Sequence, residues 1–280
     1  MNSVGHGSNS VATLTAANVV VVAGKGGVGK TTVTAVLARA AAAAGQRVLV
    51  VELDGKPALA AQLGGVAGVE VRHLSPAAAL SEYLVEHGFR RVAKRLAATG
   101  VIDVVSAAAP GIDDLVVLGK IKQLERAGEF DTILVDGPAA GHAVTFLTSP
   151  AGLLDTMRSG PVHTQAADVT ELLHDPERCR VVLVTLPEHT PVNELIETAF
   201  TIEDRAGVQL GAVVVNAVDT GPELPPDGDI DDPAVLAAAA YTRTRRADEG
   251  AQIERLAAAV PLPLVIVPFG TPDAQLAALQ

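Results

Sequence analysis

The stretch GKGGVGKTT, residues 24–32, follows directly on the apolar run NVVVVA and opens an alanine-rich segment. An almost uninterrupted β-branched run is typical of a strand buried on both faces, and the alanine-rich segment is typical of a helix. Glycine between the two lets the backbone turn tightly without Cβ clashes. The stretch therefore predicts a strand–loop–helix unit whose strand lies inside a sheet that helices cover on both faces.

The same stretch meets the pattern G-x-x-x-x-G-K-[ST] with Gly24, Gly29, Lys30 and Thr31. The backbone N–H groups of such a loop and the N-terminus of the next helix suit the phosphate chain of a nucleotide. Lys30 is expected to reach the β- and γ-phosphates, and Thr31 to bind Mg²⁺ through its hydroxyl. The alternative is a turn of a dinucleotide site, which does not require Lys-Thr at this offset. The residues predicted to hold the nucleotide here are Gly24, Gly26, Gly27, Val28, Gly29, Lys30, Thr31 and Thr32.

Further β-branched runs alternate with segments rich in alanine and leucine along the 280 residues. The connections are long enough for crossover helices. We therefore expect an α/β fold of the P-loop NTPase kind, with a doubly wound, mostly parallel sheet of about seven strands. The expected strands are residues 18–23, 47–53, 101–106, 131–136, 180–186, 211–216 and 264–268.

The chain is expected to form a flexible N-terminal tail, residues 1–17, and a single P-loop domain over residues 18–280. Two intervals, residues 55–100 and 140–178, are longer than one crossover needs, and each contains stretches that predict two helices. We expect them to form a helical layer at the edge where the strands end, with ordinary peripheral helices as the alternative. Residues 219–233 are acidic and rich in proline and glycine, which favours a mobile loop.

The net charge of −11 argues against a broad nucleic-acid surface, because neutralising phosphates needs clustered lysine and arginine. Arg243, Arg245 and Arg246 form a tight basic cluster, which is interpreted as a solvated helix face. Cys179 is the only cysteine and is interpreted as a small buried residue. No apolar run approaches the ~18 residues that span a bilayer, and the first 17 residues lack the pattern of a signal peptide. We therefore expect a cytoplasmic protein that neither inserts into membranes nor binds nucleic acid.

The stretch GKGGVGKT also contains a lysine, Lys25, that the phosphate-loop pattern does not require. It resembles the deviant Walker A loop of the ATPase group that contains the arsenite-pump subunit, the tail-anchored-protein targeting ATPase, MinD and the nitrogenase iron protein. In these families the early lysine crosses a dimer interface to the partner's nucleotide, so the resemblance implies a catalytic role in trans for Lys25. A second ammonium could neutralise charge that develops on the transferring phosphoryl group. A solvated loop charge is the alternative.

Three further sites resemble the arsenite and tail-anchored-targeting ATPases of this group. Asp54, in VVELDGKPAL, resembles the switch I aspartate that positions the attacking water, with a helix cap or a ribose contact as the alternative. Asp136, at the end of FDTILVD, resembles a Walker B carboxylate, with a plain helix cap as the alternative. Gly141 and His142 match part of switch II, although two alanines replace the usual Pro-Thr, and His142 is expected either to relay the γ-phosphate state or to pack beneath the helix. The predicted Mg²⁺ ligands are Thr31, Asp54 and Asp136.

The resemblance extends from about residue 18 to residue 270, with the motifs in the family order. APGIDDLVV resembles a Pro-Gly-Ile-Asp-Glu segment, with Asp114 in place of Glu, and VTLPEHTP matches a Thr-x-x-Glu turn at Glu188. In the family an asparagine at the position of Asn216 reads the adenine edge, and a simple turn former is the alternative. Pro268 and Phe269 are expected to flank the adenine ring. The stretches LGKIK and GPVHTQA make the sequence most similar to actinobacterial ArsA-like anion-transporting ATPases, which are thought to work in pairs.

Several branches of the group need residues that this chain lacks. The arsenite-pump subunit binds metalloid through several cysteines, the targeting ATPase joins its dimer through a CxxC zinc pair, and the nitrogenase protein shares a cluster through two cysteines per subunit. Cys179 cannot supply any of these sites alone. Met1 and Met157 cannot build a methionine-rich client groove, so a client-binding layer would rely on leucine and alanine. The C-terminal TPDAQLAALQ has no positive charge, unlike the basic helix of the membrane-binding type.

We therefore expect a dimeric switch ATPase that couples turnover of Mg²⁺ and ATP to the capture or release of a protein partner on the helical layer. The dimer would be a homodimer or a heterodimer with a paralogous ATPase. One alternative is a regulatory subunit with weak hydrolysis that pairs with an active paralogue. The other is a small-molecule phosphotransferase or ligase on the same fold, a class that usually lacks a lysine such as Lys25.

Overall fold

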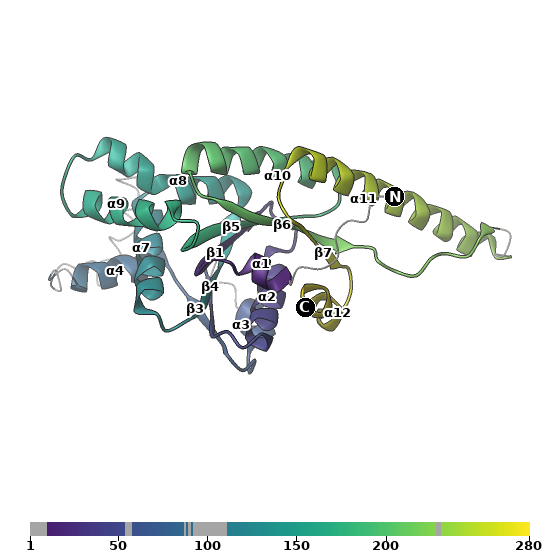
Figure 1. Ribbon diagram of the computed structural model, residues 1–280, viewed down its shortest axis with the longest axis horizontal. Helices are drawn as coiled ribbons and strands as arrows, with labels where there is room; N and C mark the ends of the chain where they lie inside the picture. Colours follow the sequence, from purple (N-terminus) through teal and green to yellow (C-terminus); the bar gives the residue numbers. More distant parts are fainter. Residues whose placement is uncertain (1–9, 54–57, 87, 89–90, 92–110, 228–230) are drawn as a thin grey trace.

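Seven strands form one sheet in the order β3-β2-β4-β1-β5-β6-β7, and each is parallel to its neighbours (Figure 1). The computed structural model describes residues 10–53, 58–86, 88, 91, 111–227 and 231–280. β1 lies in the middle of the sheet between β4 and β5, as its uninterrupted apolar run predicts. The strands are β1 Val19–Gly24, β2 Val48–Glu52, β3 Val69–His73, β4 Thr132–Ala139, β5 Cys179–Thr185, β6 Leu210–Val218 and β7 Leu264–Pro268.

Helices cover both faces of this sheet, and in Figure 1 α10 lies on the opposite side from α2 and α12. Successive side chains of a strand point to opposite faces. In β1, Val19 and Val21 therefore join one buried apolar cluster, and Val20 and Val22 join the other. This arrangement confirms the expected doubly wound α/β fold. The helices are α1 Ser10–Leu14, α2 Lys30–Ala43, α3 Ala58–Leu63, α4 Pro76–Glu86, α7 Ile112–Ala127, α8 Ala140–Thr156, α9 Pro161–His174, α10 His189–Thr201, the π-helical turn η1 Ile202–Ala206, α11 Pro233–Ala259 and α12 Pro272–Leu279.

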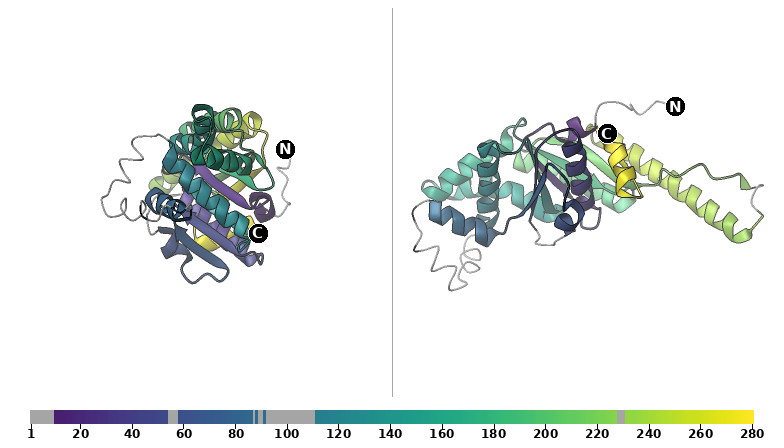
Figure 2. Two further views of the ribbon diagram at one scale, coloured as in Figure 1. Left: turned by 90° about the vertical axis from the view of Figure 1, so that its left-hand side faces the viewer. Right: turned by 90° about the horizontal axis from the view of Figure 1, so that it is seen from below.

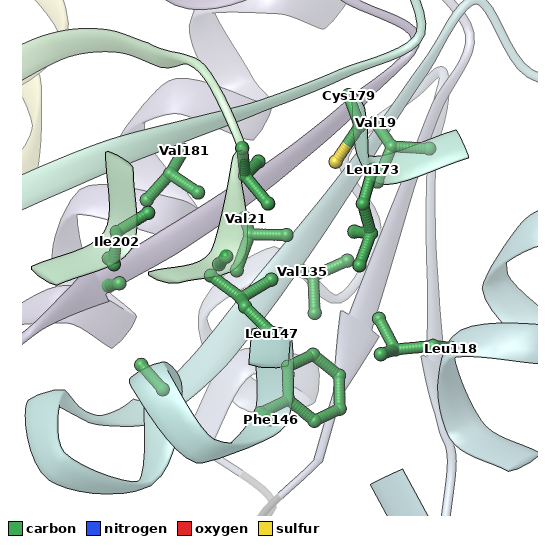
Figure 3. Close-up of a cluster of buried hydrophobic side chains, with 14 of the residues drawn as sticks. Val19, Val21, Leu118, Val135, Phe146, Leu147, Leu173, Cys179, Val181 and Ile202 are labelled. Carbon is green, nitrogen blue, oxygen red and sulfur yellow. The ribbon is translucent and has the colours of Figure 1, made fainter. Parts of the chain in front are cut away.

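The larger cluster packs β1, β4 and β5 against α7, α8 and α9 (Figure 3). Cys179, the first residue of β5, is buried in this cluster near Val19 and Leu173. Burial raises the pKa of the Cys179 thiol to about 12, because the charged thiolate loses its hydration. The thiol is thus protonated at neutral pH and behaves as a small apolar side chain. The interpretation of Cys179 as a buried residue is confirmed.

The interval of residues 55–100 contains the first of the two expected helices, α4, and also two elements that were not predicted, the helix α3 and a strand. The strand, β3, pairs in parallel with β2 through Val48 and Val69 and lies at the edge of the sheet. Its sequence VEVRH alternates apolar and polar residues, because an edge strand is only partly covered, and so it lacks the continuous apolar run of the inner strands. The second expected helix, after residue 91, and the expected strand 101–106 lie outside the described residues.

The interval of residues 140–178 forms α8 and α9, as the sequence predicted. Both helices pack on the sheet: Phe146 and Leu147 of α8 and Val169 and Leu172 of α9 are buried in the larger cluster. They also contact α7, which in turn contacts α4. Figure 1 shows these four helices gathered at one end of the molecule, opposite the projecting end of α11. We call α4, α7, α8 and α9 the helical layer.

The expected tail of residues 1–17 is too long. Ser10–Leu14 forms the short helix α1, which contacts α2, β6 and α12. Val11 and Leu14 are 3% and 1% exposed and belong to the smaller apolar cluster. The sequence VATL offers too few residues for a helical period to be recognised, so only packing identifies it. Residues 1–9 lie outside the described part of the chain.

The N-terminal half of α11 projects from the body of the protein, with the acidic loop after β6 beside it (Figure 2). The cluster of Arg243, Arg245 and Arg246 faces this loop and not only solvent, which corrects the expectation of a solvated helix face. Arg246 donates to Asp219 Oδ1 at 2.9 Å, and Arg243 donates to Asp227. The hydrogen bond from Arg246 lowers the pKa of Asp219. Although α11 has 27 residues, none of the described helices combines the length and apolar character that crossing a bilayer requires.

The packing of α1 predicts that Leu14→Ala lowers the free energy of unfolding by about 2–4 kcal/mol, because a buried leucine is replaced by a cavity. Urea denaturation followed by circular dichroism measures this change. Ala12→Gln, an exposed position of the same helix, is the control and should change stability by less than about 0.5 kcal/mol. If both variants unfolded with the stability of the original protein, the N-terminal helix would not be part of the folded core.

Candidate functional site

The loop between β1 and α2 has a backbone shape that depends on glycine. Gly27 and Gly29 have φ angles of 89° and 88°, in the left-handed region that other residues rarely adopt. Gly29 is also the N-cap of α2, so the unpaired N–H groups of the first helical turn lie at this loop. A Cβ atom added to Gly26 or Gly27 would meet no atom within 4 Å, which leaves open space beside the backbone. The loop is therefore a cradle that an anion can enter.

At two other glycines the loop has no room for a side chain. A Cβ atom at Gly24 would overlap the carbonyl oxygen of Val184 in β5. A Cβ atom at Gly29 would overlap the side-chain amide of Asn216 in β6. The first and last glycines of the pattern are thus needed for the close approach of the neighbouring strands, apart from any contact with phosphate.

Thr31 and Asp136, two of the predicted Mg²⁺ ligands, lie together. Thr31 is in the first turn of α2, and its hydroxyl donates to Asp136 Oδ2 at 2.8 Å. The hydroxyl of Thr34 lies 3.3 Å from Asp136 Oδ1. Asp136 is in β4 opposite Val22 of β1, so the pairing of these two strands brings the carboxylate beside the loop. Thr32 is the next residue of α2 and is partly buried.

The two lysines of the loop have different partners. Lys30 is the first residue of α2, and its Nζ donates to the carbonyl oxygen of Lys25 at 3.2 Å. Lys25 is in the loop itself, and its Nζ lies 2.6 Å from Glu194 Oε1 of α10. The ammonium of Lys30 is thus directed to the cradle, whereas that of Lys25 is directed to a helix that follows β5.

Asn216 supports the loop from β6. Its Nδ2 donates to the carbonyl oxygen of Val28 at 2.9 Å, and the side chain is 6% exposed. Its Oδ1 is buried and has no hydrogen-bond partner among the described residues. The next residue, Ala217, has a φ of 58°, a conformation that costs a non-glycine residue about 1 kcal/mol or more. The adenine contact predicted for Asn216 stays a prediction, and the observed role is to hold the loop backbone.

A cavity of about 620 Å³ lies where β5, β6 and β7 end. This volume is typical of sites for small ligands. Phe269 follows Pro268, the last residue of β7, and lines the cavity with its side chain 75% exposed. Tyr241 of α11 lines it too and is 70% exposed. The other lining residues are Leu186, Pro187, Glu188, His189, Ala217, Arg245, Asp248, Glu249 and Gln252.

The remaining predicted residues lie around these features. Glu188 is the N-cap of α10. His142, in the first turn of α8, is exposed, so of its two alternative roles packing beneath the helix is wrong, and the relay of the γ-phosphate state stays a prediction. Burial and then the charge of Asp113 raise the pKa of Asp114 at the start of α7, while the charge of His142 lowers it. Asp54 lies outside the described residues.

Sequence reasoning missed three residues of this site. Glu194 is 169 positions from Lys25, so no local spacing connects them. Tyr241 lies on α11, whose polar and apolar residues show no clear helical face, and it reaches the cavity only because that helix passes the ends of the strands. Thr34 could have been found, because it is one helical turn beyond Thr31.

Comparisons with known proteins give a family of ATPases, in agreement with the phosphate loop described above. A sequence model of the family described as anion-transporting ATPase matches residues 17–162. The ATPase BagA of Mycobacterium tuberculosis is 34% identical over 220 residues, which cover 70% of this chain and 63% of that protein. The arsenical pump-driving ATPase of Escherichia coli is 28% identical over 205 residues, 69% of this chain and 33% of that protein. The ATPase GET3 of Rhodotorula glutinis is 28% identical over 143 residues, 47% of this chain and 40% of that protein. The chain thus spans less than two thirds of the length of each relative.

The contact between Asn216 and the loop predicts that Asn216→Asp lowers the free energy of unfolding by about 1–3 kcal/mol or more. The variant places a buried carboxylate oxygen against the carbonyl of Val28 and removes the donor. Urea denaturation measures the difference.

Asn193→Asp is the matched control for this substitution. Asn193 uses its Oδ1 to accept from Arg255 at 2.5 Å, and aspartate keeps that acceptor; the variant gives up only the exposed contact of Nδ2 with His189 Nδ1 at 3.3 Å. The control should therefore be as stable as the original protein within about 0.5 kcal/mol. An equal loss in both variants would mean that the amide of Asn216 does not support the loop.

Proposed function

Because the chain belongs to the family of anion-transporting ATPases, we propose that it binds Mg²⁺ and ATP at the loop between β1 and α2 and hydrolyses ATP as a dimeric switch. The observation that carries this proposal is the 2.8 Å hydrogen bond between Thr31 and Asp136 beside the glycine cradle. A hydroxyl in the first helical turn and a carboxylate on a neighbouring strand are the protein groups that P-loop NTPases place at Mg²⁺.

The loop fits a triphosphate. Gly26 and Gly27 leave open space beside the backbone, and the N-terminus of α2 supplies N–H groups and a positive dipole end. The Nζ of Lys30 already lies at the loop, 3.2 Å from the carbonyl of Lys25. Its ammonium would exchange that carbonyl for the β- and γ-phosphates, a charge-assisted contact that is stronger than a neutral one.

The Thr31 and Asp136 pair fits the shell of a magnesium ion. Oxygen ligands from a hydroxyl, a carboxylate and the phosphates are those that Mg²⁺ prefers. The ion, when bound, would neutralise negative charge on the phosphate oxygens. Asp54 follows β2, the strand next to β4, and we assign it the positioning of the attacking water near the same shell.

The cavity at the ends of β5, β6 and β7 supports a site for the adenine base. Phe269 and Tyr241 offer it aromatic surfaces for stacking. Asn216 does not line the cavity itself but precedes Ala217, which does; a contact of Asn216 with the adenine edge would use its buried Oδ1, since its Nδ2 is bound to Val28. Pro268, the last residue of β7, does not line the cavity, so its part in the site would be to place Phe269, which does.

Lys25 carries the dimeric part of the proposal. Its side chain is 39% exposed at the edge of the cradle, so a second subunit can approach it. An ammonium that arrives from the partner subunit would neutralise charge on the transferring phosphoryl group, so hydrolysis would depend on closure of a homodimer or of a heterodimer with a paralogous ATPase. A weakly hydrolysing regulatory subunit is the alternative, and a cytoplasmic setting suits both.

Capture of a protein partner on the helical layer is the last part of the proposal. The described part of this layer exposes one large apolar side chain, Val85 of α4, at 37%. A hollow of about 200 Å³ between α4 and α7 is lined by Ala79, Tyr83 and Val116 and also by Glu82 and Lys120, which form an ion pair of 2.6 Å. A partner on this layer would therefore make both apolar and polar contacts.

The two lysines should give different defects when each is replaced by alanine. Lys30→Ala should weaken ATP binding by about 10- to 100-fold, the value of a hydrogen bond to a charged group. Lys25→Ala should leave ATP affinity within about threefold but lower turnover by about 10³-fold or more, because its contact forms only in the closed dimer. Fluorescent-nucleotide titration and phosphate release measure the two quantities.

Two outcomes would contradict these assignments. Unchanged ATP affinity in Lys30→Ala would place the triphosphate elsewhere. Unchanged turnover in Lys25→Ala would reject its role in trans. Turnover of the original protein that rises only on addition of a paralogue would favour the regulatory alternative.

Asp136→Asn should make ATP binding independent of magnesium. The asparagine oxygen can still accept from Thr31, so the fold should be kept, but the negative charge beside the ion is lost. ATP affinity of the original protein should rise when Mg²⁺ is added, and that of the variant should not. Asp131→Asn, an exposed position just before β4, is the matched control and should keep the full magnesium effect. A full magnesium effect in Asp136→Asn would remove it from the shell.

A further inference from the structure

The ion pair of Lys25 and Glu194 joins the phosphate loop to α10. Lys25 Nζ lies 2.6 Å from Glu194 Oε1, although the two residues are 169 positions apart in the sequence. The side chains are 39% and 40% exposed, so solvent and a second molecule can both reach the pair. The ammonium of Lys25 is thus directed to a carboxylate of its own chain.

α10 holds Glu194 in a fixed place. Val192 and Leu195, which flank Glu194 on the same helix, are buried in the larger apolar cluster. The guanidinium of Arg255 in α11 donates to Asn193 Oδ1 at 2.5 Å and so links α10 to the next helix. The lysine of the pair lies on a loop, whereas the glutamate lies on a packed helix. The glutamate therefore decides where the ammonium lies.

We infer that Glu194 is a positioning residue that retains the ammonium of Lys25 in its own subunit until the partner's nucleotide draws it across; this inference rests on the proposed function. With its Nζ 2.6 Å from Glu194 Oε1, the ammonium is attracted to a carboxylate of its own subunit, and this attraction opposes a move toward the partner's phosphates. A triphosphate carries more negative charge than one carboxylate, so the exchange becomes favourable once the partner's phosphates are near. Dimer closure then includes the breaking of this pair.

The strength of the pair sets the size of the effect. A half-exposed ion pair shifts an equilibrium by about 1.5- to 5-fold. Such a pair delays closure at low concentrations of ATP or protein but does not prevent it at saturation. The attraction is also screened by salt, since the Debye length falls to about 3 Å at 1 M ionic strength.

The test compares Glu194→Gln with Glu197→Gln in the full chain. Glu197 is an exposed glutamate of the same helix and is the matched control. Sedimentation of the protein with ATP and Mg²⁺ measures dimer formation, and phosphate release measures turnover. Glu194→Gln should form dimers at about 1.5- to 5-fold lower protein concentration and turn over faster below saturation, and this gain should shrink in 1 M salt. Glu197→Gln should match the original protein.

A double variant that carries Lys25→Ala and Glu194→Gln shows whether Glu194 acts by retaining the Lys25 ammonium or only by supporting the structure. Dimer formation by Lys25→Ala should be the same with and without Glu194→Gln, because the carboxylate acts only through the lysine. Glu194→Gln with unchanged or weaker dimer formation, or a gain that persists in the Lys25→Ala background, would overturn the inference. Lys25→Ala with unchanged turnover, or an original protein that stays monomeric with ATP, would instead overturn the proposed function. Urea denaturation of each variant verifies that the fold is intact.

Discussion

The close approach of β5 and β6 to the phosphate loop is the constraint on which the rest of the structure depends. Gly24 and Gly29 have no space for a Cβ atom, because Val184 and Asn216 occupy it. The apolar run of β1 brings the loop to the centre of the sheet. The close contacts of Gly24 with Val184 and of Gly29 with Asn216 then fix the position of the loop backbone relative to β5 and β6. With the loop so placed, Thr31 can reach Asp136 on one side of β1, and the cavity opens on the other side.

The sequence was most informative where a single local rule decides the structure. Continuous apolar runs identified β1 and its neighbours, because a strand buried on both faces has few other sequences available. The same rule failed for β3, an edge strand with alternating Glu70 and Arg72, whose pairing with β2 depends on residues distant in the sequence. Helical periodicity failed for α1, which is too short to show a period and is fixed by the burial of Leu14.

The candidate site shows the same division. The phosphate loop follows β1, and Asp136 lies in the neighbouring strand β4 opposite Val22, where a motif and its position suffice to predict which groups meet. The partners of Lys25 and of Asn216 could not be predicted, because both contacts arise from the packing of β5, β6 and α10 around the loop. The position of Lys30 could thus be predicted from the motif, whereas the partner of Lys25 depends on how the rest of the chain folds around the loop. The position of Lys25 therefore depends on α10 as well as on the loop.

The burial of Cys179 has a practical consequence. The chain has no other cysteine and no tryptophan, and this thiol is enclosed between β5 and the helices that cover it. A maleimide dye or a spin label attached to one engineered cysteine on the exposed side of α10, such as Glu197→Cys, would carry a signal without background from the rest of the molecule. Energy transfer between two such labels, one on each subunit, could then follow the opening and closing of the proposed dimer in real time.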